Sequence, residues 1–247
     1  GYARRDRLVY YEMIEHLGPD QANLLEELGG QITPPGLWGE LAGMENEKQI
    51  IERRIVDPLG HPEVAERYGV SPPKAVILFG PPGTGKTSFA KAISSRLGWP
   101  FVELFPSRLA ATGTGGLAAS LREAFADLAD LDELVLFIDE VEEIATARSG
   151  ASTAELGVTN ELLKLIPAFR QHDSRLLVCA TNAVHSLDSA FLRPGRFDYV
   201  IPVGPPDQPA RRAVWQRYLG SANGNGNVDV DRLVTASELF TPADIEF

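Results

Sequence analysis

The chain has 247 residues, 44% of them hydrophobic, and a formal net charge of -11. That length and composition can bury a substantial core, which excludes a disordered chain and predicts one large domain with a smaller piece. The acidic balance argues against a broad nucleic-acid surface. No apolar run approaches the ~18 residues of a membrane span, and the polar start has no signal-peptide core. We therefore expect a cytoplasmic protein whose single cysteine, Cys179, is a buried core residue.

Residues 1–36 differ in pattern from the rest of the chain and are expected to form a helical segment and linker. Apolar residues recur at helical spacing from Tyr10 to Leu17, which predicts a first helix ended by a Gly-Pro pair. A second short helix is expected, with Asp20 as its cap and leucines along one face. The first apolar stripe could bind a partner or a membrane surface, although packing within the protein is the simpler interpretation. Two prolines in residues 32–36 predict a stiff linker.

Residues 37–204 alternate apolar runs with helical patterns, which predicts an α/β domain. Nearly continuous apolar strands separated by helices indicate a parallel sheet covered on both faces, with the ligand site at the carboxyl ends of the strands. Strands are expected over residues 75–79, 101–104, 134–138, 176–180 and 199–203, and helices are expected to begin near Thr87, Leu117, Ala154 and Leu187.

The first strand leads directly into "GPPGTGKT", a complete phosphate-binding loop. A glycine-rich turn that opens a helix points several backbone N–H groups at one spot, which suits a triphosphate. Lys86 would reach the β and γ phosphates, and the Thr87 hydroxyl would ligate Mg²⁺. The same letters can arise by chance in a turn-rich loop. The expected nucleotide-binding residues of this loop are Pro82, Gly83, Thr84, Gly85, Lys86, Thr87 and Ser88.

Another predicted strand runs straight into two carboxylates, Asp139 and Glu140. Ending a buried strand in this way is costly unless the charges meet a cation or a polar site. Asp139 is placed to hold Mg²⁺, and Glu140 to orient or deprotonate the attacking water. The alternative is a solvated acidic helix start, which is how Glu142 and Glu143 are interpreted.

Two further motifs come after later strands. Asn182 ends one of them, where its amide could position the lytic water, although many strands end in Asn for reasons of turn geometry. Arg193 and Arg196 flank a Pro-Gly pair. Their planar, permanently charged groups suit a phosphate in a neighbouring subunit, and the alternative is a surface pair bonded to Asp198 or to a chain terminus.

The stretches "GPPGTGKT", "LFIDE", "CATN" and "LRPGRFD", in this order, resemble the AAA+ ATPases, specifically the AAA clade that contains valosin-containing protein, katanin, spastin and the proteasomal ATPases. The resemblance covers about Trp38 to Glu246. It implies that residues 40–42, Ala42 included, approach the adenine and that Asp139 and Glu140 form Walker B. It also implies that Asn182 is sensor 1 and that Arg193 and Arg196 act in trans.

The resemblance makes residues 205–247 a partial small helical lid, with Tyr218 near the adenine. The family's substrate-gripping loop falls on residues 112–115, where Gly113 replaces the usual aromatic or large apolar residue. We therefore expect an ATP- and Mg²⁺-dependent module, hexameric by resemblance, that remodels or unfolds a protein partner. The alternative is a nucleotide-controlled scaffold or switch without threading activity. A DNA-acting clamp loader or initiator is disfavoured by the acidic charge.

Overall fold

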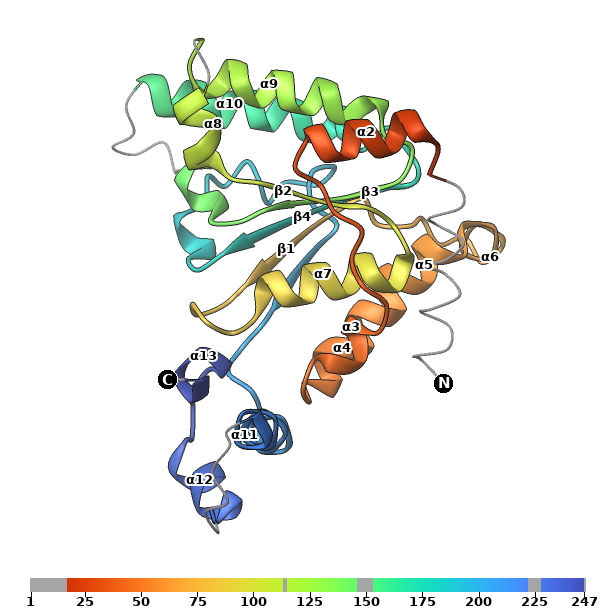
Figure 1. The fold of residues 1–247 in the computed structure, drawn as a ribbon. Coiled ribbons are helices and arrows are strands. Elements are labelled where there is room, and N and C mark those ends of the chain that lie inside the picture. Colours follow the sequence, from red (N-terminus) through yellow and green to blue (C-terminus); the bar gives the residue numbers. More distant parts are fainter. Residues whose placement is uncertain (1–16, 113–114, 146–152, 222–227, 247) are drawn as a thin grey trace.

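The computed structural model describes residues 17–112, 115–145, 153–221 and 228–246 (Figure 1). Its centre is a five-stranded parallel sheet in the order β2-β3-β4-β1-β5. This confirms the expected α/β P-loop fold, and the predicted strand bounds agree with the observed ones to within one residue at each end. The strands are β1 (Ala75–Phe79), β2 (Phe101–Leu104), β3 (Leu134–Ile138), β4 (Arg175–Thr181) and β5 (Tyr199–Pro202).

The register of the central strands brings three strand ends to one edge of the sheet. Phe79 of β1 pairs with Thr181 of β4, and Ile138 of β3 pairs with Cys179 of β4. The residues that come directly after these strands therefore emerge side by side, because parallel strands all end at the same edge. The amide of Gly80 donates a hydrogen bond of 3.2 Å to the carbonyl oxygen of Thr181, which joins the ends of β1 and β4.

One face of the sheet is covered by α2, α8, α9 and α10, which lie above it in Figure 1. Their apolar sides form a core with alternate residues of the strands, including Phe125, Phe169 and Leu136. Cys179 is fully buried in this core, as expected, and burial raises the pKa of its thiol. The elements of this layer are α2 (Pro19–Glu27), α8 (Pro106–Thr112), α9 (Leu117–Asp127), the 3-10 turn η2 (Leu128–Asp130) and α10 (Thr153–Phe169).

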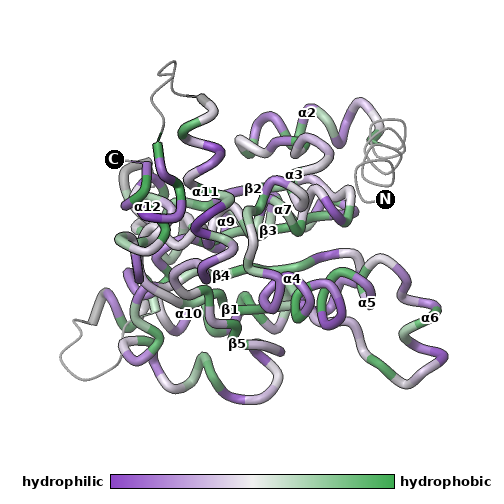
Figure 2. Tube along the Cα trace, turned by 90° about the horizontal axis from the view of Figure 1, so that it is seen from below, coloured by the Kyte–Doolittle hydropathy of each residue, from purple (hydrophilic) through white to green (hydrophobic). Residues whose placement is uncertain are grey.

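The opposite face packs mainly against α7 and the helices that precede β1. Phe89 and Ile93 of α7 and Ile51 and Ile55 are fully buried there. Figure 2 views the molecule from below and shows hydrophilic and hydrophobic stretches in turn along α4 and α5, as expected for helices with one buried face. This layer contains α3 (Leu37–Glu40), α4 (Glu45–Ile51), the π-helical turn η1 (Glu52–Val56), α5 (Asp57–Gly60), α6 (Pro62–Arg67) and α7 (Lys86–Leu97).

The segment before α3 is packed on the sheet rather than extended as a spacer. Gln31 and Phe101 exchange main-chain hydrogen bonds of 2.8 and 2.9 Å, which adds an antiparallel bridge to β2. The Thr33 hydroxyl lies 3.0 Å from that of Ser94 and is buried. Helix α2 begins at Pro19 with Gly18 as its N-cap, so the prediction that Asp20 caps it is wrong. Proline is preorganised for the first helical position, and Asp20 lies in the first turn. The helix predicted from Tyr10 lies almost wholly outside the described residues.

After β5, α11 (Gln208–Ser221), α12 (Val230–Ala236) and α13 (Pro242–Glu246) form a small helical group, at the lower left of Figure 1. The Asp229 carboxylate caps α12 by accepting hydrogen bonds from the next turn, and the Trp215 indole donates 3.0 Å to Ser237 Oγ. Gly43 touches this group, since a Cβ at Gly43 would lie 2.2 Å from the Ala210 Cβ. No helix in the described part of the chain is long and apolar enough to span a membrane.

The prediction of a helix beginning near Leu187 is wrong. The segment contains the 3-10 turn η4 (Val184–Ser186) followed by turns up to β5. Leu187 and Phe191 are buried, but Asp188 Oδ1 accepts a hydrogen bond of 2.8 Å from the Ala190 amide and closes a turn instead. Asp and Pro-Gly favour such turns over a continuous helix.

Candidate functional site

The phosphate loop connects β1 to α7 and adopts a conformation that requires glycine. Gly83 and Gly85 have φ angles of 76° and 89°, in the left-handed region. At Gly80 a Cβ would lie 2.0 Å from the Val203 carbonyl oxygen. The Thr84 hydroxyl donates 2.9 Å to the Pro81 carbonyl oxygen and closes the turn. The loop therefore delivers the chain to the first turn of a 12-residue helix, where unpaired N–H groups and the helix dipole favour an anion.

Lys86 lies at the centre of the site and is buried. Its ammonium donates to the carbonyl oxygens of Gly80 and Pro81, at 2.8 and 3.0 Å, and to Asn182 Oδ1 at 2.8 Å. These contacts use all three ammonium donors. Burial lowers the pKa of Lys86, and the nearby carboxylates of Asp139, Glu142 and Glu140 oppose that shift.

Asp139 is joined to the loop through Thr87, whose hydroxyl donates to Asp139 Oδ2 at 3.3 Å. The other carboxylate oxygen of Asp139 accepts a hydrogen bond of 2.9 Å from the main-chain amide of Glu140. Glu140 has φ 47° and ψ 45°, a left-handed conformation that costs a non-glycine residue of order 1 kcal/mol. Its exposed side chain leaves the strand at a sharp turn. Partial burial raises the pKa of Glu140, as do the like charges of Glu143, Asp139 and Glu142 in that order, against the opposing effect of Lys86.

Glu142 is a site residue that the sequence interpretation missed. It lies in the 3-10 turn η3 (Val141–Glu143), and its Oε1 accepts a hydrogen bond of 3.0 Å from the main-chain amide of Asn182. Its interpretation as a solvated helix start is therefore wrong, whereas Glu143 is exposed. Glu142 reaches Asn182 because β3 and β4 are neighbours in the sheet. The sequence pattern carries no signal for that strand order, so it could not identify Glu142.

The donor set at the loop fits Mg²⁺. The described residues contain no group of three or more His, Cys, Asp or Glu side chains that could hold a metal by themselves. Thr87 Oγ1 and Asp139 Oδ2 are instead a pair of hard oxygen donors next to the loop. Mg²⁺ commonly takes one or two protein oxygens and fills its remaining positions with water and substrate phosphates. This pair meets that requirement.

A cavity of about 260 Å³ adjoins the loop, between the sheet domain and the small helical group. Three residues predicted to bind nucleotide lie in its wall. Ala42 and Ser88 come from the sheet domain, and Tyr218 comes from the small helical group. Apolar side chains dominate the rest of the wall, which suits a planar base. The full lining is Leu37, Glu40, Leu41, Ala42, Met44, Thr84, Gly85, Ser88, Phe89, Lys91, Val214, Arg217, Tyr218 and Pro242. Burial and a hydrogen bond with Glu246 raise the pKa of the Tyr218 hydroxyl.

The start of α13 closes directly on the loop. The Ala243 amide lies 3.5 Å from the Gly83 carbonyl oxygen, and a Cβ at Gly83 would lie 2.8 Å from the Ala243 Cβ and 2.9 Å from Thr241 Oγ1. Pro82 precedes this contact and is exposed. A movement of the loop would therefore be transmitted to the small helical group.

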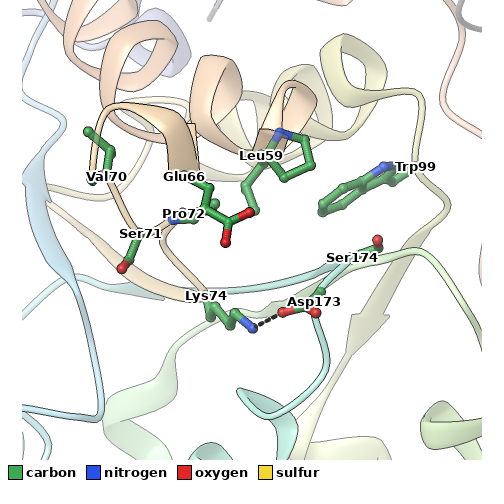
Figure 3. A pocket seen from close by; sticks show the side chains of 11 residues that line it. Leu59, Glu66, Val70, Ser71, Pro72, Lys74, Trp99, Asp173 and Ser174 are labelled. Carbon is green, nitrogen blue, oxygen red and sulfur yellow. Dashed lines mark hydrogen bonds and ion pairs between the residues drawn. The ribbon is translucent and has the colours of Figure 1, made fainter. Parts of the chain in front are cut away.

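A larger cavity, of about 510 Å³, lies at the other end of the sheet (Figure 3). Lys74 and Ser174 precede β1 and β4 and lie in its wall, with the Trp99 ring beside them. Lys74 Nζ pairs there with Asp173 Oδ1 at 2.6 Å. The cavity contains no predicted site residue. Ligands of parallel α/β sheets bind at the carboxyl ends of the strands, so size alone does not make this the functional site.

The two arginines do not join the strand ends that hold Lys86. The Arg196 guanidinium donates to the Ala190 carbonyl oxygen, and Arg193 is exposed. Two residues after Arg196, Asp198 accepts hydrogen bonds of 2.8 and 3.1 Å from the amides of Lys74 and Ala75. This point is the amino end of β1, and the loop lies about 16 Å away at ~3.3 Å per strand residue.

The Asp198 carboxylate is held by Arg170, through bonds of 2.6 and 2.8 Å. The alternative interpretation of Arg193 and Arg196 as ion-pair partners of Asp198 therefore has no support among the described residues. Gly113, the residue at the position expected to grip substrate, lies outside the described residues.

Comparison with known proteins adds to this geometry. The chain is 35% identical over 230 residues to Protein SAV of Sulfolobus acidocaldarius, which is 92% of this chain and 29% of that protein. It is 32% identical over 217 residues to the cell division cycle protein 48 homolog of Archaeoglobus fulgidus, covering 87% of this chain and 30% of the relative. It is 34% identical over 217 residues to the proteasome-activating nucleotidase of Methanococcus vannielii, covering 86% of this chain and 53% of that relative.

The chain thus spans between about a third and a half of the length of these relatives. The sequence profile of the ATPase family associated with various cellular activities (AAA) matches residues 76–205, which is more than half of the chain. The matched range begins in β1 and contains the phosphate loop, the two carboxylates and Asn182. The chain therefore belongs to the AAA family of ATPases.

Proposed function

We propose that this chain binds Mg-ATP at the phosphate loop and in the adjoining cavity between the sheet domain and the small helical group, and hydrolyses it at the ends of β1, β3 and β4. The observation that carries the proposal is the convergence of Lys86, the Thr87–Asp139 pair and Asn182 at one edge of the sheet. The adenine would occupy the cavity lined by Ala42 and Tyr218. The triphosphate would lie on the amides of residues 82–88, at the amino end of α7.

The chain's own residues divide the chemistry between them. Lys86 neutralises phosphate charge, and Asn182 orients the attacking water through its amide. Glu140 accepts the proton of that water as its oxygen bonds to the γ phosphorus and the bond to the bridging oxygen of ADP breaks. Thr87 and Asp139 would hold Mg²⁺, which supplies charge neutralisation for the phosphates when bound.

Arg193 and Arg196 are proposed to complete the site of an adjoining copy of the chain. Support comes from the position of Arg196 near the amino end of β1, at the opposite end of the strand from its own loop. An arginine that reaches a neighbour's γ phosphate can add about 10³ to 10⁵ in rate. The proposed assembly is a closed ring, hexameric by family resemblance. Successive copies then contact each other through two different surfaces.

The name of one relative, the proteasome-activating nucleotidase, favours work on proteins, and we propose that nucleotide-driven movement remodels a protein partner. The contact between Gly83 and α13 supplies a route from the phosphates to the small helical group. Gly113 favours the second candidate, a nucleotide-controlled scaffold or switch, because glycine offers no side-chain surface to grip a threaded polypeptide. An unfolding assay with a fluorescent substrate separates the two, since a switch binds its partner in a nucleotide-dependent way without unfolding it.

The ATPase assignment is tested by phosphate release and by titration with a fluorescent ATP analogue. Lys86→Ala is expected to weaken binding by at least about 10-fold, because it removes the central cation. Glu140→Gln is expected to keep binding within about 3-fold and to lose about 10²-fold or more in turnover. Lys164→Ala, at an exposed lysine on α10, serves as the control. Unchanged phosphate release in both site variants would refute the assignment.

A further inference from the structure

Asn182 is held at two points in this structure. Its side-chain Oδ1 accepts from Lys86 Nζ at 2.8 Å, and its main-chain amide donates to Glu142 Oε1 at 3.0 Å. The first contact joins β4 to the loop after β1, and the second joins β4 to the turn after β3. Three neighbouring strand ends are therefore connected through this one residue.

The turn that carries Glu142 is itself fixed. The buried hydroxyl of Thr159, on α10, donates 3.1 Å to the Ile144 carbonyl oxygen. The main-chain amide of Asp188, in the chain segment after β4, donates a hydrogen bond of 2.9 Å to the Ala145 carbonyl oxygen. Hydrogen bonds from two other segments thus hold the residues after Glu142. Its carboxylate is consequently a preset acceptor rather than a mobile surface group.

The contacts of Lys86 show why a second anchor is needed. All three of its ammonium donors are used by protein oxygens, so it must give up one of them to bind a phosphate. Asn182 Oδ1 is the only side-chain acceptor among the three, and a side chain can turn away without moving the loop. Once Lys86 turns to a phosphate, Asn182 loses its side-chain anchor, and the hydrogen bond that its main-chain amide donates to Glu142 remains.

We propose that Glu142 is a positioning residue for ATP hydrolysis. It holds the main-chain amide of Asn182 while the side-chain amide of Asn182 turns from Lys86 to the attacking water. The inference rests on the proposed ATPase site. It assigns Glu142 no contact with nucleotide, so its loss should reduce turnover and leave nucleotide affinity almost unchanged.

The test compares two substitutions of nearly equal shape in the full chain. Glu142→Gln keeps an oxygen that can accept from the Asn182 amide, whereas Glu142→Met fills the same space without an acceptor. Glu143→Gln, at the exposed neighbour, is the control for loss of one negative charge. Initial rates of phosphate release give kcat and KM at a pH where the rate no longer depends on pH. A fluorescent ATP analogue gives the affinity.

Glu142→Met is expected to lower kcat by about 10- to 100-fold, since a misplacement of about 1 Å in a positioning group can have that effect. Nucleotide affinity should stay within about 3-fold, and Glu142→Gln should recover most of the lost rate. The inference is overturned if Glu142→Met retains its kcat, or if the Gln and Met variants lose kcat and affinity together. Failure of the proposed function looks different, because the wild-type chain would then show no phosphate release dependent on Lys86.

Discussion

Lys86 Nζ and Asn182 Oδ1 lie 2.8 Å apart, so the cation of the phosphate loop is hydrogen-bonded to the residue directly after β4. The two residues are 96 positions apart in the chain, and the pairing of β1 with β4 brings them together. The contact couples phosphate binding to the orientation of Asn182, because Lys86 must release one acceptor to bind a phosphate and the side-chain oxygen of Asn182 can leave without moving the loop.

That coupling predicts different effects on ATP affinity for two substitutions of Asn182. Asn182→Asp places a carboxylate against Lys86, which strengthens the existing contact and repels phosphate, so ATP affinity should fall by about 10-fold or more. Asn182→Ala removes the acceptor without adding charge and should keep affinity within about 3-fold while it slows turnover. Titration with a fluorescent ATP analogue at two salt concentrations measures both affinities, and phosphate release measures turnover. Equal affinities for the Asp and Ala variants would contradict the coupling.

The raised pKa of Glu140 predicts the shape of the acid side of the pH profile. A base must be deprotonated to act, and a carboxyl with a raised pKa keeps its proton to a higher pH. The value of kcat/KM, which reports the pKa in the nucleotide-free chain, should therefore begin to fall at a higher pH than the ordinary glutamate pKa of about 4.3 would give. After burial, the charge of Glu143 makes the largest contribution to this shift.

Removal of that charge gives the matched comparison. Glu143→Gln should move the acid limb of kcat/KM to lower pH and leave the plateau at higher pH unchanged. The measurement is phosphate release across a series of buffers of constant ionic strength, because surface charges are screened by salt. An acid limb that stays in place in this variant would show that another group controls it.

Much of the fold can be read from the sequence because its strands are buried on both faces. Ala75, Val76, Ile77 and Leu78 are all fully buried, and such strands appear as continuous apolar runs. The same criterion fails after β4. Leu187, Ala190 and Phe191 have helical spacing, yet they are buried as separate anchors of a series of turns. A spacing pattern reports burial and does not by itself report the backbone path.

The sequence predicts which residues follow the strand ends of the site, but it does not predict the contacts that join them. Asp139 and Asn182 each come directly after an apolar strand, and Thr87 is the last residue of the loop motif, so all three can be picked out in the sequence. The hydrogen bond between Glu142 and the main-chain amide of Asn182 depends on β3 lying next to β4. Strand order cannot be predicted from a local sequence pattern. The same holds for the contact of Gly83 with α13, which depends on where the small helical group packs.

The close approach of Gly43 to Ala210 predicts that a single methyl group will disturb the cavity. Gly43 has φ 64°, and a Cβ there would lie 2.2 Å from the Ala210 Cβ and 2.4 Å from its Cα. Gly43→Ala should therefore push α11 away from the sheet domain, with a loss of about 1 to 3 kcal/mol in the free energy of unfolding. ATP affinity should also fall, because both sides of the cavity contribute to its wall.

Gly39→Ala is the control for that experiment. Gly39 lies in α3, four residues before Gly43, and a Cβ there meets no atom within 4 Å. Alanine should be neutral or slightly stabilising at this position, since glycine is the poorer helix former. Denaturant unfolding and nucleotide titration of the two variants should therefore diverge. Similar values for both would mean that the small helical group is not held through Gly43.

Asp198 is predicted to be a stability residue at the end of the sheet opposite the site. Burial alone would raise its pKa, but hydrogen bonds from Arg170 and from the amides of Lys74 and Ala75 outweigh that effect and lower it. A carboxyl whose folded pKa is depressed stabilises the protein above its unfolded pKa, and this stabilisation is lost as the pH falls through the folded pKa. The contribution of Asp198 should thus be complete at pH 7 and should disappear only below its ordinary pKa of 3.8.

Asp198→Asn should lower the free energy of unfolding at pH 7 by about 2 kcal/mol, because it weakens several charge-assisted hydrogen bonds to a partly buried group. The difference from the wild type should shrink in acid, when the wild-type carboxyl also loses its charge. Asp173→Asn is the matched control, since Asp173 pairs with Lys74 but its side chain is 99% exposed, and unfolding should not change measurably. Urea unfolding at pH 7 and in acid measures both variants. A deficit for Asp198→Asn that persists unchanged in acid would show that shape, and not charge, accounts for its effect.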